Sequence, residues 1–267
     1  MRSSRYFRLV GIGSILSAGW LCYGPVSAEV LVRESFDYPP GSLQGRDGGV
    51  GWAGAYEEFG GHPAGEVVAP RGEEAFGAGS YARFARDSYH FRQLDTLAIP
   101  ARYLNERGTV GVAGETLWVS VFLQAEEPIL PPFFGISLFE GGEERLFLGR
   151  GTNETGGWKI QTEYDNVLSG EYTEAQWIVL RIDFRNDGSD GARRDGVTMF
   201  VNPDPSDPEP DASEAAGEIR RSPGPLSFNR VRFVGNGNGF RMNDFRIGTS
   251  YSAVSSAAEA GTVVTTR

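Results

Sequence analysis

Short runs of alternating apolar and polar residues recur along most of this chain, separated by turns rich in glycine, proline and asparagine. Successive side chains of a strand point to opposite faces, so this period of two predicts strands. The clearest run is Thr116–Gln124, whose two faces are Leu117, Val119, Val121 and Leu123 on one side and Trp118, Ser120, Phe122 and Gln124 on the other. Because both faces carry apolar residues, we expect a central strand that is covered on both sides.

Similar runs predict strands before and after this one. They are Val30–Tyr38, Tyr81–Leu97, Phe133–Glu140, Arg145–Arg150, Gly157–Tyr164, Gln176–Phe184 and Val197–Asn202. In Gln176–Phe184 we expect the apolar set to face the core, which leaves the other set on the far face: Trp177, Val179, Arg181 and Asp183. No convincing helical pattern of ten residues is present.

The last two predicted strands, Asn229–Val234 and Phe240–Ile247, flank a turn rich in glycine and asparagine. In the second of them the alternation changes phase at Asn243 and Asp244. A β-bulge at these two residues would produce such a shift and would redirect a side chain.

About ten to twelve strands of this kind predict an all-β fold, an antiparallel β-sandwich with little helix, in a single domain over residues 29–251. Two segments are expected to lie outside its core. Residues 203–225 are rich in proline and acidic residues and predict a flexible loop. Residues 252–267 are mostly small and polar and predict a disordered C-terminal tail.

The chain begins with the pattern of a secretory signal peptide over residues 1–28. Three arginines within the first eight residues are followed by an apolar stretch and by Val26-Ser27-Ala28, a cleavage site of the small-x-small type. The apolar stretch is too short to span a bilayer comfortably, and an uncleaved anchor is the alternative. We expect a secreted protein (periplasmic, extracellular or at the cell surface) with no membrane insertion after signal cleavage.

Cysteine content and charge exclude several kinds of chemistry. The only cysteine, Cys22, lies inside the predicted signal, so the remaining chain has no thiol for disulfides, nucleophilic catalysis or zinc binding. The formal net charge is −10, and loss of the three signal arginines makes it about −13. Because such a surface repels phosphate groups, no nucleic acid is expected as a partner.

Four stretches, in this order, carry a resemblance to a known family: ESFDYPPGSLQGRDGGVGWAGAY, TLWVSVFLQ, WIVLRIDF followed by VTMFVNPDP, and NDFRIGTSY. They resemble secreted bacterial proteins of the concanavalin A-like lectin/glucanase superfamily, especially laminin-G-like (LamG-like) domains, over most of residues 34–251. The resemblance implies a jelly roll of two curved sheets in which the first and last strands, Glu34–Tyr38 and the bulged one, are neighbours. The superfamily includes lectins, carbohydrate-binding modules, glycosidases, lyases and adhesion domains, so the fold does not determine the function.

Proteins bind sugars by stacking aromatic rings on them and by fixing their hydroxyls with a few polar groups. Two sets of residues offer these features, one on the far face of the central strands and one in a glycine-rich loop: Trp118, Gln124, Trp177, Arg181 and Asp183, and then Trp52 and Tyr56. An extracellular polysaccharide or other glycan is the expected partner. The alternative is that these aromatics cover the second face of the sheet or hold loops in place.

A structural calcium ion is the one cofactor that the resemblance suggests. With the first and last strands side by side, Asp37 and the bulge residue Asp244 become candidate ligands of one calcium ion. The alternative is that Asp244 caps a turn or pairs with a nearby arginine.

No catalytic string of the superfamily is complete in this chain. Glycosidases of this fold carry three carboxylates at alternate positions of one strand, whereas Glu163 and Asp165 lack the third. Lyases combine tyrosine or histidine with arginine, and Tyr89, His90 and Arg92 match them in composition only. We therefore expect a non-catalytic module that binds glycan. The alternatives are a polysaccharide-active hydrolase or lyase with an unrecognised site, and a structural or adhesion protein of the cell envelope.

Overall fold

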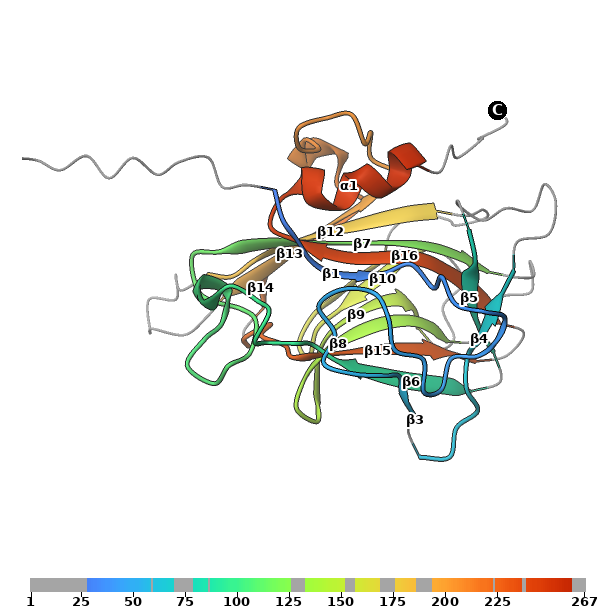
Figure 1. The fold of residues 1–267 in the computed structure, drawn as a ribbon. Helices are drawn as coiled ribbons and strands as arrows, with labels where there is room; N and C mark the ends of the chain where they lie inside the picture. Colours follow the sequence, from blue (N-terminus) through green and yellow to red (C-terminus); the bar gives the residue numbers. More distant parts are fainter. Residues whose placement is uncertain are drawn as a thin grey trace, which may run out of the picture.

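Two antiparallel sheets are stacked on each other, with the main hydrophobic core between them (Figure 1). The computed structural model describes residues 28–58, 60–69, 79–85, 87–125, 133–151, 157–168, 176–185, 194–222, 224–236 and 239–260. The prediction of an all-β antiparallel sandwich is confirmed. Within the described ranges, no helix is both long and apolar enough to cross a membrane.

The first sheet contains nine of the described strands. Their order across the sheet is β14 (Gly217–Ser222), β13 (Asp195–Val201), β12 (Gln176–Asp183), β7 (Thr116–Ala125), β16 (Phe240–Gly248), β5 (Tyr81–Phe84), β4 (Glu66–Val68) and β2 (Gly41–Ser42), and β1 (Val30–Glu34) also pairs with β16. The central position predicted for the run at 116–124 is confirmed, because β7 lies between β12 and β16.

The second sheet contains seven of the described strands. Their order is β11 (Asn166–Leu168), β10 (Lys159–Gln161), β9 (Glu143–Arg150), β8 (Phe134–Glu140), β15 (Arg230–Gly235), β6 (Ser88–Gln93) and β3 (Glu57–Glu58). A short 3-10 helix, η2 (Ala101–Tyr103), lies in the connection between β6 and β7. The core side chains of β7 and β12 are fully buried, as their alternation predicts: Leu117, Val119, Val121 and Leu123, and Ile178, Leu180 and Ile182.

The first and last strands are neighbours, as the resemblance implied. β1 pairs with β16, and Glu34 lies opposite Phe245. The strand ends at Glu34 instead of continuing to Tyr38, because Phe36 has a positive φ of 53° that no strand accepts. The predicted bulge is confirmed, since the register of β16 with β7 shifts between Asn243 and Arg246.

The prediction of a flexible loop over residues 203–225 is wrong for much of that segment. It contains a 3-10 helix, η3 (Ala212–Glu214), and the edge strand β14, which pairs with β13. One buried apolar side chain, Ile219, anchors β14 to the core. Backbone pairing with β13 holds the rest of the strand, so it forms although its sequence is poor in apolar residues.

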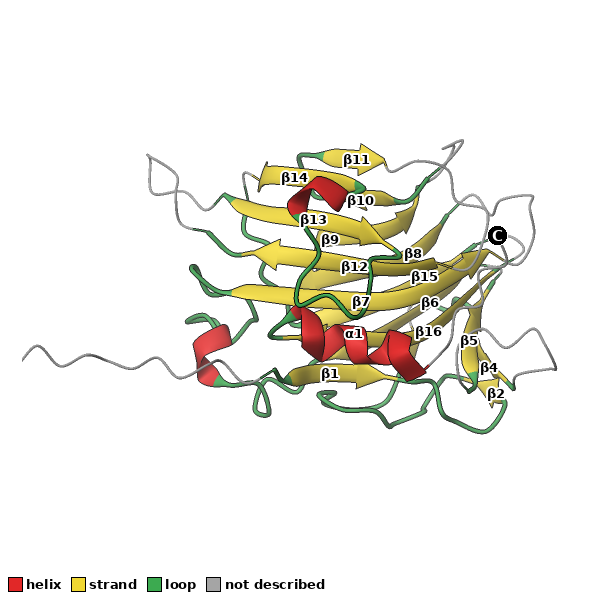
Figure 2. Cartoon of the chain, turned by 90° about the horizontal axis from the view of Figure 1, so that it is seen from above, coloured by secondary structure: helices red, strands yellow, loops and turns green. Residues whose placement is uncertain are grey.

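The prediction of a disordered tail over residues 252–267 is wrong for its first part. The helix α1 spans Tyr251–Ala260 and lies on the outer face of the nine-stranded sheet, over β7 and β16 (Figure 2). Ser250 caps it, because its Oγ accepts a hydrogen bond from the Ala253 backbone N–H at 3.2 Å. Tyr251 and Val254 are buried against the sheet. Residues 261–267 lie outside the described ranges.

Candidate functional site

The predicted ligand-binding tryptophans share the outer face of the nine-stranded sheet, but α1 covers them. Trp118 and Trp177 are each 3% exposed. The ring of Tyr251 lies 5.4 Å from that of Trp118 and 6.1 Å from that of Trp177. These two residues therefore do not form an open platform. They cover the second face of the sheet, which is the alternative stated for them.

Small residues on the sheet allow α1 to approach this closely. A Cβ added to Gly248 would lie 2.7 Å from the Cβ of Ala253. Ser120 Oγ donates a hydrogen bond to the Val254 carbonyl oxygen at 3.3 Å, and the Tyr251 hydroxyl donates to the Asp204 carbonyl oxygen at 2.6 Å. The helix is thus fitted to the sheet by steric and polar contacts.

The charged residues predicted for the same face are engaged in ion pairs. Arg181 pairs with Asp183 at 3.0 Å and with Glu209 at 2.5 Å. Asp183 also accepts hydrogen bonds from the Thr116 hydroxyl at 2.8 Å and from Arg185 at 3.1 Å. Gln124 is half-buried at the end of the face. These ion pairs and hydrogen bonds link neighbouring strands and a loop to one another. The charged groups do not converge on an open site.

Trp52 and Tyr56, the predicted loop aromatics, enclose a buried arginine. The guanidinium carbon of Arg92 lies 4.6 Å from the centre of the Trp52 ring and 4.8 Å from that of Tyr56. Arg92 donates to the Gly54 carbonyl oxygen at 2.7 Å, which ties the glycine-rich loop to the sheet. The two aromatics therefore hold a loop in place, which is the alternative stated for them.

The buried arginine is neutralised by an equally buried carboxylate. Arg92 and Glu34 side chains are 0% and 1% exposed, and their N–O distance is 2.6 Å. The Glu34 carboxylate also accepts hydrogen bonds from the Phe36 backbone N–H and the Tyr38 hydroxyl. Burial is the largest influence on this carboxyl and raises its pKa. An ion pair this enclosed is a structural element of the loop and the first strand.

Asp244, a predicted calcium ligand, is paired with two arginines. Its Oδ1 accepts from Arg33 at 3.3 Å and from Arg246 at 3.0 Å, and its Oδ2 accepts from Arg246 at 3.0 Å. Asp37, the other predicted ligand, is exposed and follows the end of β1. No group of three or more His, Cys, Asp or Glu side chains that could hold a metal ion is present in the described part of the chain. Calcium binding stays an untested prediction.

The residues of the two incomplete catalytic patterns do not come together in an acid–base site. Glu163 and Asp165 lie in an exposed turn. Tyr89 and His90 point to opposite faces of β6, and the fully buried His90 accepts a hydrogen bond from the Gly65 N–H at 2.9 Å. His90 is therefore a core residue.

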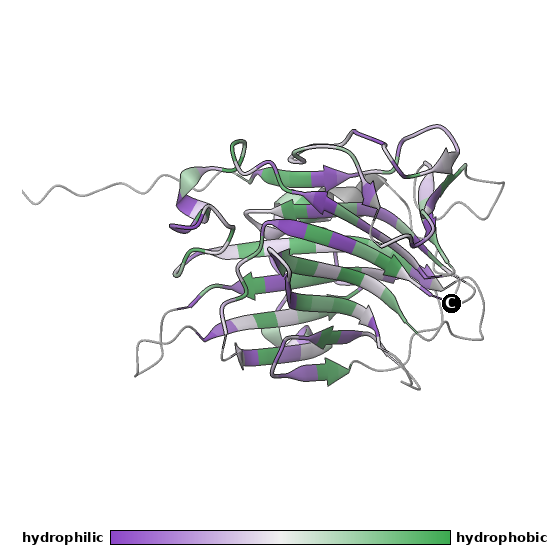
Figure 3. Ribbon diagram, turned by 90° about the horizontal axis from the view of Figure 1, so that it is seen from below, coloured by the Kyte–Doolittle hydropathy of each residue, from purple (hydrophilic) through white to green (hydrophobic). Residues whose placement is uncertain are grey.

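The outer face of the seven-stranded sheet carries a set of residues that the sequence analysis did not identify. Figure 3 shows the molecule from this side. The strand register aligns one residue from each strand: Glu57, Phe91, Arg232, Ser137, Phe147, Gln161 and Asn166. Directly opposed residues of antiparallel strands share a face. We call this line the transverse row; at about 4.8 Å between neighbouring strands it spans about 29 Å.

Two arginines are stacked on phenylalanine rings along this face. Arg230 belongs to the row beside the transverse row, where it lies opposite Phe139. Its guanidinium carbon is 4.1 Å from the centre of the Phe91 ring, and that of Arg232 is 4.9 Å from the Phe139 ring. The two rings meet edge to face at 5.2 Å. Such cation–π contacts hold the planar guanidinium groups in fixed orientations.

Arg232 is also tied to a carboxylate and a hydroxyl. Its Nη2 donates to Glu144 at 2.6 Å and to the Ser137 hydroxyl at 2.9 Å. The Arg232 side chain is 14% exposed and that of Glu144 is 36% exposed. Burial raises the pKa of Glu144 and lowers the pKa of Arg232. Partly desolvated charges with shifted pKa values are typical of functional sites, although ion pairs in structural roles show them too.

A third row on this face combines a half-buried tyrosine with two glycines. Tyr89, Val234, Gly135 and Gly149 lie opposite one another in turn. A Cβ at Gly135 or Gly149 would lie 2.1 or 2.0 Å from a carbonyl oxygen of the facing strand, so only glycine fits. The Tyr89 ring is 4.3 Å from that of His62. Tyr89 is half-buried, whereas Val234, Gly135 and Gly149 are buried.

Neither a protein-family model nor a curated protein matches this sequence. Among solved structures, the chain is similar to the globular domain of calreticulin from T. cruzi, with 16% identity and a TM-score of 0.48 over 86% of this chain and 92% of that one. It is similar to domain 4 of AbnA, a GH43 extracellular arabinanase from Geobacillus stearothermophilus in complex with arabinotriose, with 13% identity and a TM-score of 0.39 over 86% and 98%. A GH131 β-glucanase catalytic domain from Podospora anserina follows with 10% identity and a TM-score of 0.33 over 65% and 74%. Similarities of this size carry no argument about what the chain binds.

Proposed function

We propose that the protein is a secreted, non-catalytic β-sandwich module that binds a polysaccharide along the transverse row. The observation that carries the proposal is the alignment of charged and amide side chains along the transverse row, namely Glu57, Arg232, Gln161 and Asn166. The rings of the row, Phe91 and Phe147, are buried, with 4% and 2% exposure, so they support these polar groups and do not themselves meet the ligand. A row of about 29 Å suits several linked sugar residues better than a single one. The signal-like start of the chain supports export.

The stacked arginines and Glu144 supply the polar contacts that a glycan needs. Guanidinium groups donate to sugar oxygens, and a carboxylate accepts from sugar hydroxyls. Because Arg230 and Arg232 are already held on Phe91 and Phe139, little side-chain entropy is lost when a ligand binds. Tyr89 provides a half-buried ring for stacking at the border of the site.

A glycan array followed by calorimetric titration of the best oligosaccharide tests the proposal. Arg232→Met keeps the apolar stem but removes the donors, and we expect an affinity loss of about tenfold or more. The matched control is Arg181→Met on the nine-stranded sheet, whose affinity should equal that of the wild type. Equal affinity of all three proteins, or loss in the control alone, would contradict the proposal.

One observation favours a lyase as the second candidate function. Tyr89 lies against His62, and the guanidinium carbon of Arg232 is 5.8 Å from the centre of the Tyr89 ring. A lyase abstracts the proton next to a uronate carboxylate with a tyrosine or histidine, while an arginine stabilises the developing charge. Incubation with a uronate polysaccharide separates the two candidates. A lyase yields an unsaturated, ultraviolet-absorbing product that Tyr89→Phe abolishes, whereas a binding module yields none.

A further inference from the structure

The strand β14 forms one edge of the nine-stranded sheet. Within the described ranges it pairs with β13 alone, so its other side is open. An edge strand presents unpaired backbone N–H and C=O groups, to which a strand of another chain can pair. We propose that β14 pairs with β14 of a second copy of this chain, in antiparallel orientation about a two-fold axis at Ile219. The proposal goes beyond the function inferred above, because it requires no glycan.

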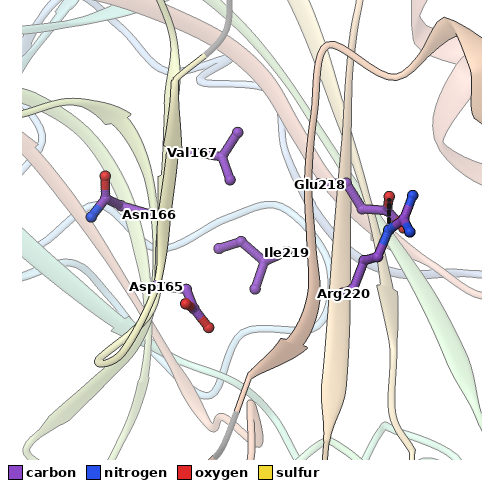
Figure 4. A pocket seen from close by; sticks show the side chains of 6 residues that line it. All are labelled: Asp165, Asn166, Val167, Glu218, Ile219 and Arg220. Carbon is purple, nitrogen blue, oxygen red and sulfur yellow. Dashed lines mark hydrogen bonds and ion pairs between the residues drawn. The ribbon is translucent and has the colours of Figure 1, made fainter.

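The side chains of β14 divide between two sides of the strand, as Figure 4 shows. Ile219 points toward Val167 of β11 and is buried in the core between the sheets. Glu218 and Arg220 lie on the opposite side, where they form an ion pair at 2.8 Å. Their side chains are 39% and 82% exposed. Because so exposed a pair contributes little to the stability of one copy, both charges are available to a partner.

The charges of β14 complement those of a second β14 in one register. Directly opposed residues of antiparallel strands share a face, so outward residues must lie opposite outward residues. With the two-fold axis at Ile219, Glu218 of each copy lies opposite Arg220 of the other. With the axis at Glu218 or at Arg220, two like charges would lie directly opposite each other, which is unfavourable. This charge complementarity indicates a second copy as the occupant of the edge.

Charged residues on an edge strand often prevent pairing. They do so by pointing toward the core side, where a partner strand would bury them, or by repelling a like charge. Glu218 and Arg220 do neither, because they point away from the core and carry opposite charges. The strand is short, and its register with β13 shifts near its end, so we expect a dimer of micromolar affinity.

Exposed apolar side chains lie at the same edge of the molecule. In the described part of the chain four large apolar side chains are exposed, and two of them, Tyr164 and Leu168, belong to β11 and the turn before it. β11 lies against β14, since a Cβ on Gly217 would be 2.9 Å from the Val167 side chain. Exposed apolar groups favour association with another surface, and a second copy at β14 would lie beside them.

Analytical ultracentrifugation of the purified protein tests the proposal. The wild type should reach twice the mass of one chain by about 100 µM. Glu218→Arg and Arg220→Glu, at exposed positions, each place like charges opposite each other twice in the interface. Each should therefore weaken dimerisation by about tenfold or more. An equimolar mixture of the two variants should dimerise again, because every opposed pair then has opposite charges.

Two further proteins serve as controls. The double variant Glu218→Arg/Arg220→Glu exchanges the two charges and should dimerise like the wild type. Arg83→Glu reverses a charge in an exposed ion pair with Glu66, away from this edge, and should also dimerise like the wild type.

Three outcomes would overturn the proposal. A wild type that stays monomeric would show that the edge does not pair with itself. Single variants that dimerise like the wild type would place the interface on another surface. A mixture of the two variants that stays monomeric would show that Glu218 and Arg220 of different copies do not meet.

Discussion

The two outer faces of the sandwich both carry aromatic side chains, yet different groups cover them. On the nine-stranded sheet, apolar residues of α1 lie over a cluster made of Tyr81, Trp118, Phe122, Trp177 and Phe200. On the seven-stranded sheet, the guanidinium groups of Arg230 and Arg232 lie over Phe91 and Phe139. Aromatic content alone therefore does not show which face binds a ligand.

The nature of the cover determines what each face can do. A helix that packs by apolar contact excludes water and ligands alike, and its burial stabilises the fold. An arginine covers a ring with its flat surface but keeps hydrogen-bond donors at the solvent boundary. We infer that the helix-covered face contributes to stability and the arginine-covered face contributes to recognition.

The largest expected effect comes from removing the ring that lies against the two tryptophans. Tyr251→Ala should lower the free energy of unfolding by about 3–5 kcal/mol, since the ring is 1% exposed. Urea denaturation measures the loss, and the tryptophan emission should shift to the red. Ser252→Ala, at an exposed position of α1, is the control and should change stability by less than about 0.5 kcal/mol. A Tyr251→Ala protein of wild-type stability would show that α1 does not close this face.

Gly248→Ala tests whether the helix is fitted to the sheet. The added Cβ would lie 2.7 Å from the Cβ of Ala253, so we expect a loss of about 1–3 kcal/mol. Combining it with Ala253→Gly removes the clash, and the double variant should be no less stable than Ala253→Gly alone. Strictly additive losses in this double-mutant cycle would contradict a direct contact.

On the other face, Arg232→Met should destabilise the protein less than Tyr251→Ala. It leaves Glu144 without its ion pair, but this carboxylate is 36% exposed and regains water, so we expect a loss of about 1–2 kcal/mol. The same variant should lose glycan binding, whereas Tyr251→Ala should keep it at temperatures where it is folded. If Tyr251→Ala lost glycan binding and Arg232→Met kept it, the roles assigned to the two faces would be reversed.

The smallest effect is a pH dependence from Glu144. Its raised folded pKa means that the folded protein takes up this proton more readily than the unfolded chain does. The stability contributed by Glu144 is thus fully present below the ordinary carboxyl pKa and is lost as pH rises through the folded value. The difference in unfolding free energy between wild type and Glu144→Gln should fall slightly as pH rises above 4.5. An increase over that range would contradict the assigned shift.

Alternation along the strands was enough to predict the sandwich, the central strand and the bulge, because these depend on which residues share a face. It could not predict what lies over a face. α1 is built largely from alanine and serine, which favour or tolerate a helix but leave little apolar period to detect. The helix packs against β7 and β16. The need for a glycine at position 248 follows only from its contact with Ala253 of that helix.

The seven-stranded face was missed for a different physical reason. In β6 the charged Arg92 points inward and the aromatic Tyr89 and Phe91 point outward, which reverses the usual pattern. The reversal is explained by Glu34, which neutralises Arg92 from 58 positions away. No local sequence pattern reveals a partner so distant in the chain. By contrast, the alternation of Arg230 and Arg232 with buried residues of β15 was visible in the sequence.

A chemical-shift map of the protein with a bound oligosaccharide tests the central claim most directly. The account predicts that the largest amide shifts fall on the seven-stranded sheet, within residues 89–93, 136–139 and 230–234. Largest shifts on β7, β12 and α1, around Trp118, Trp177 and Tyr251, would place the ligand on the helix-covered face and contradict it.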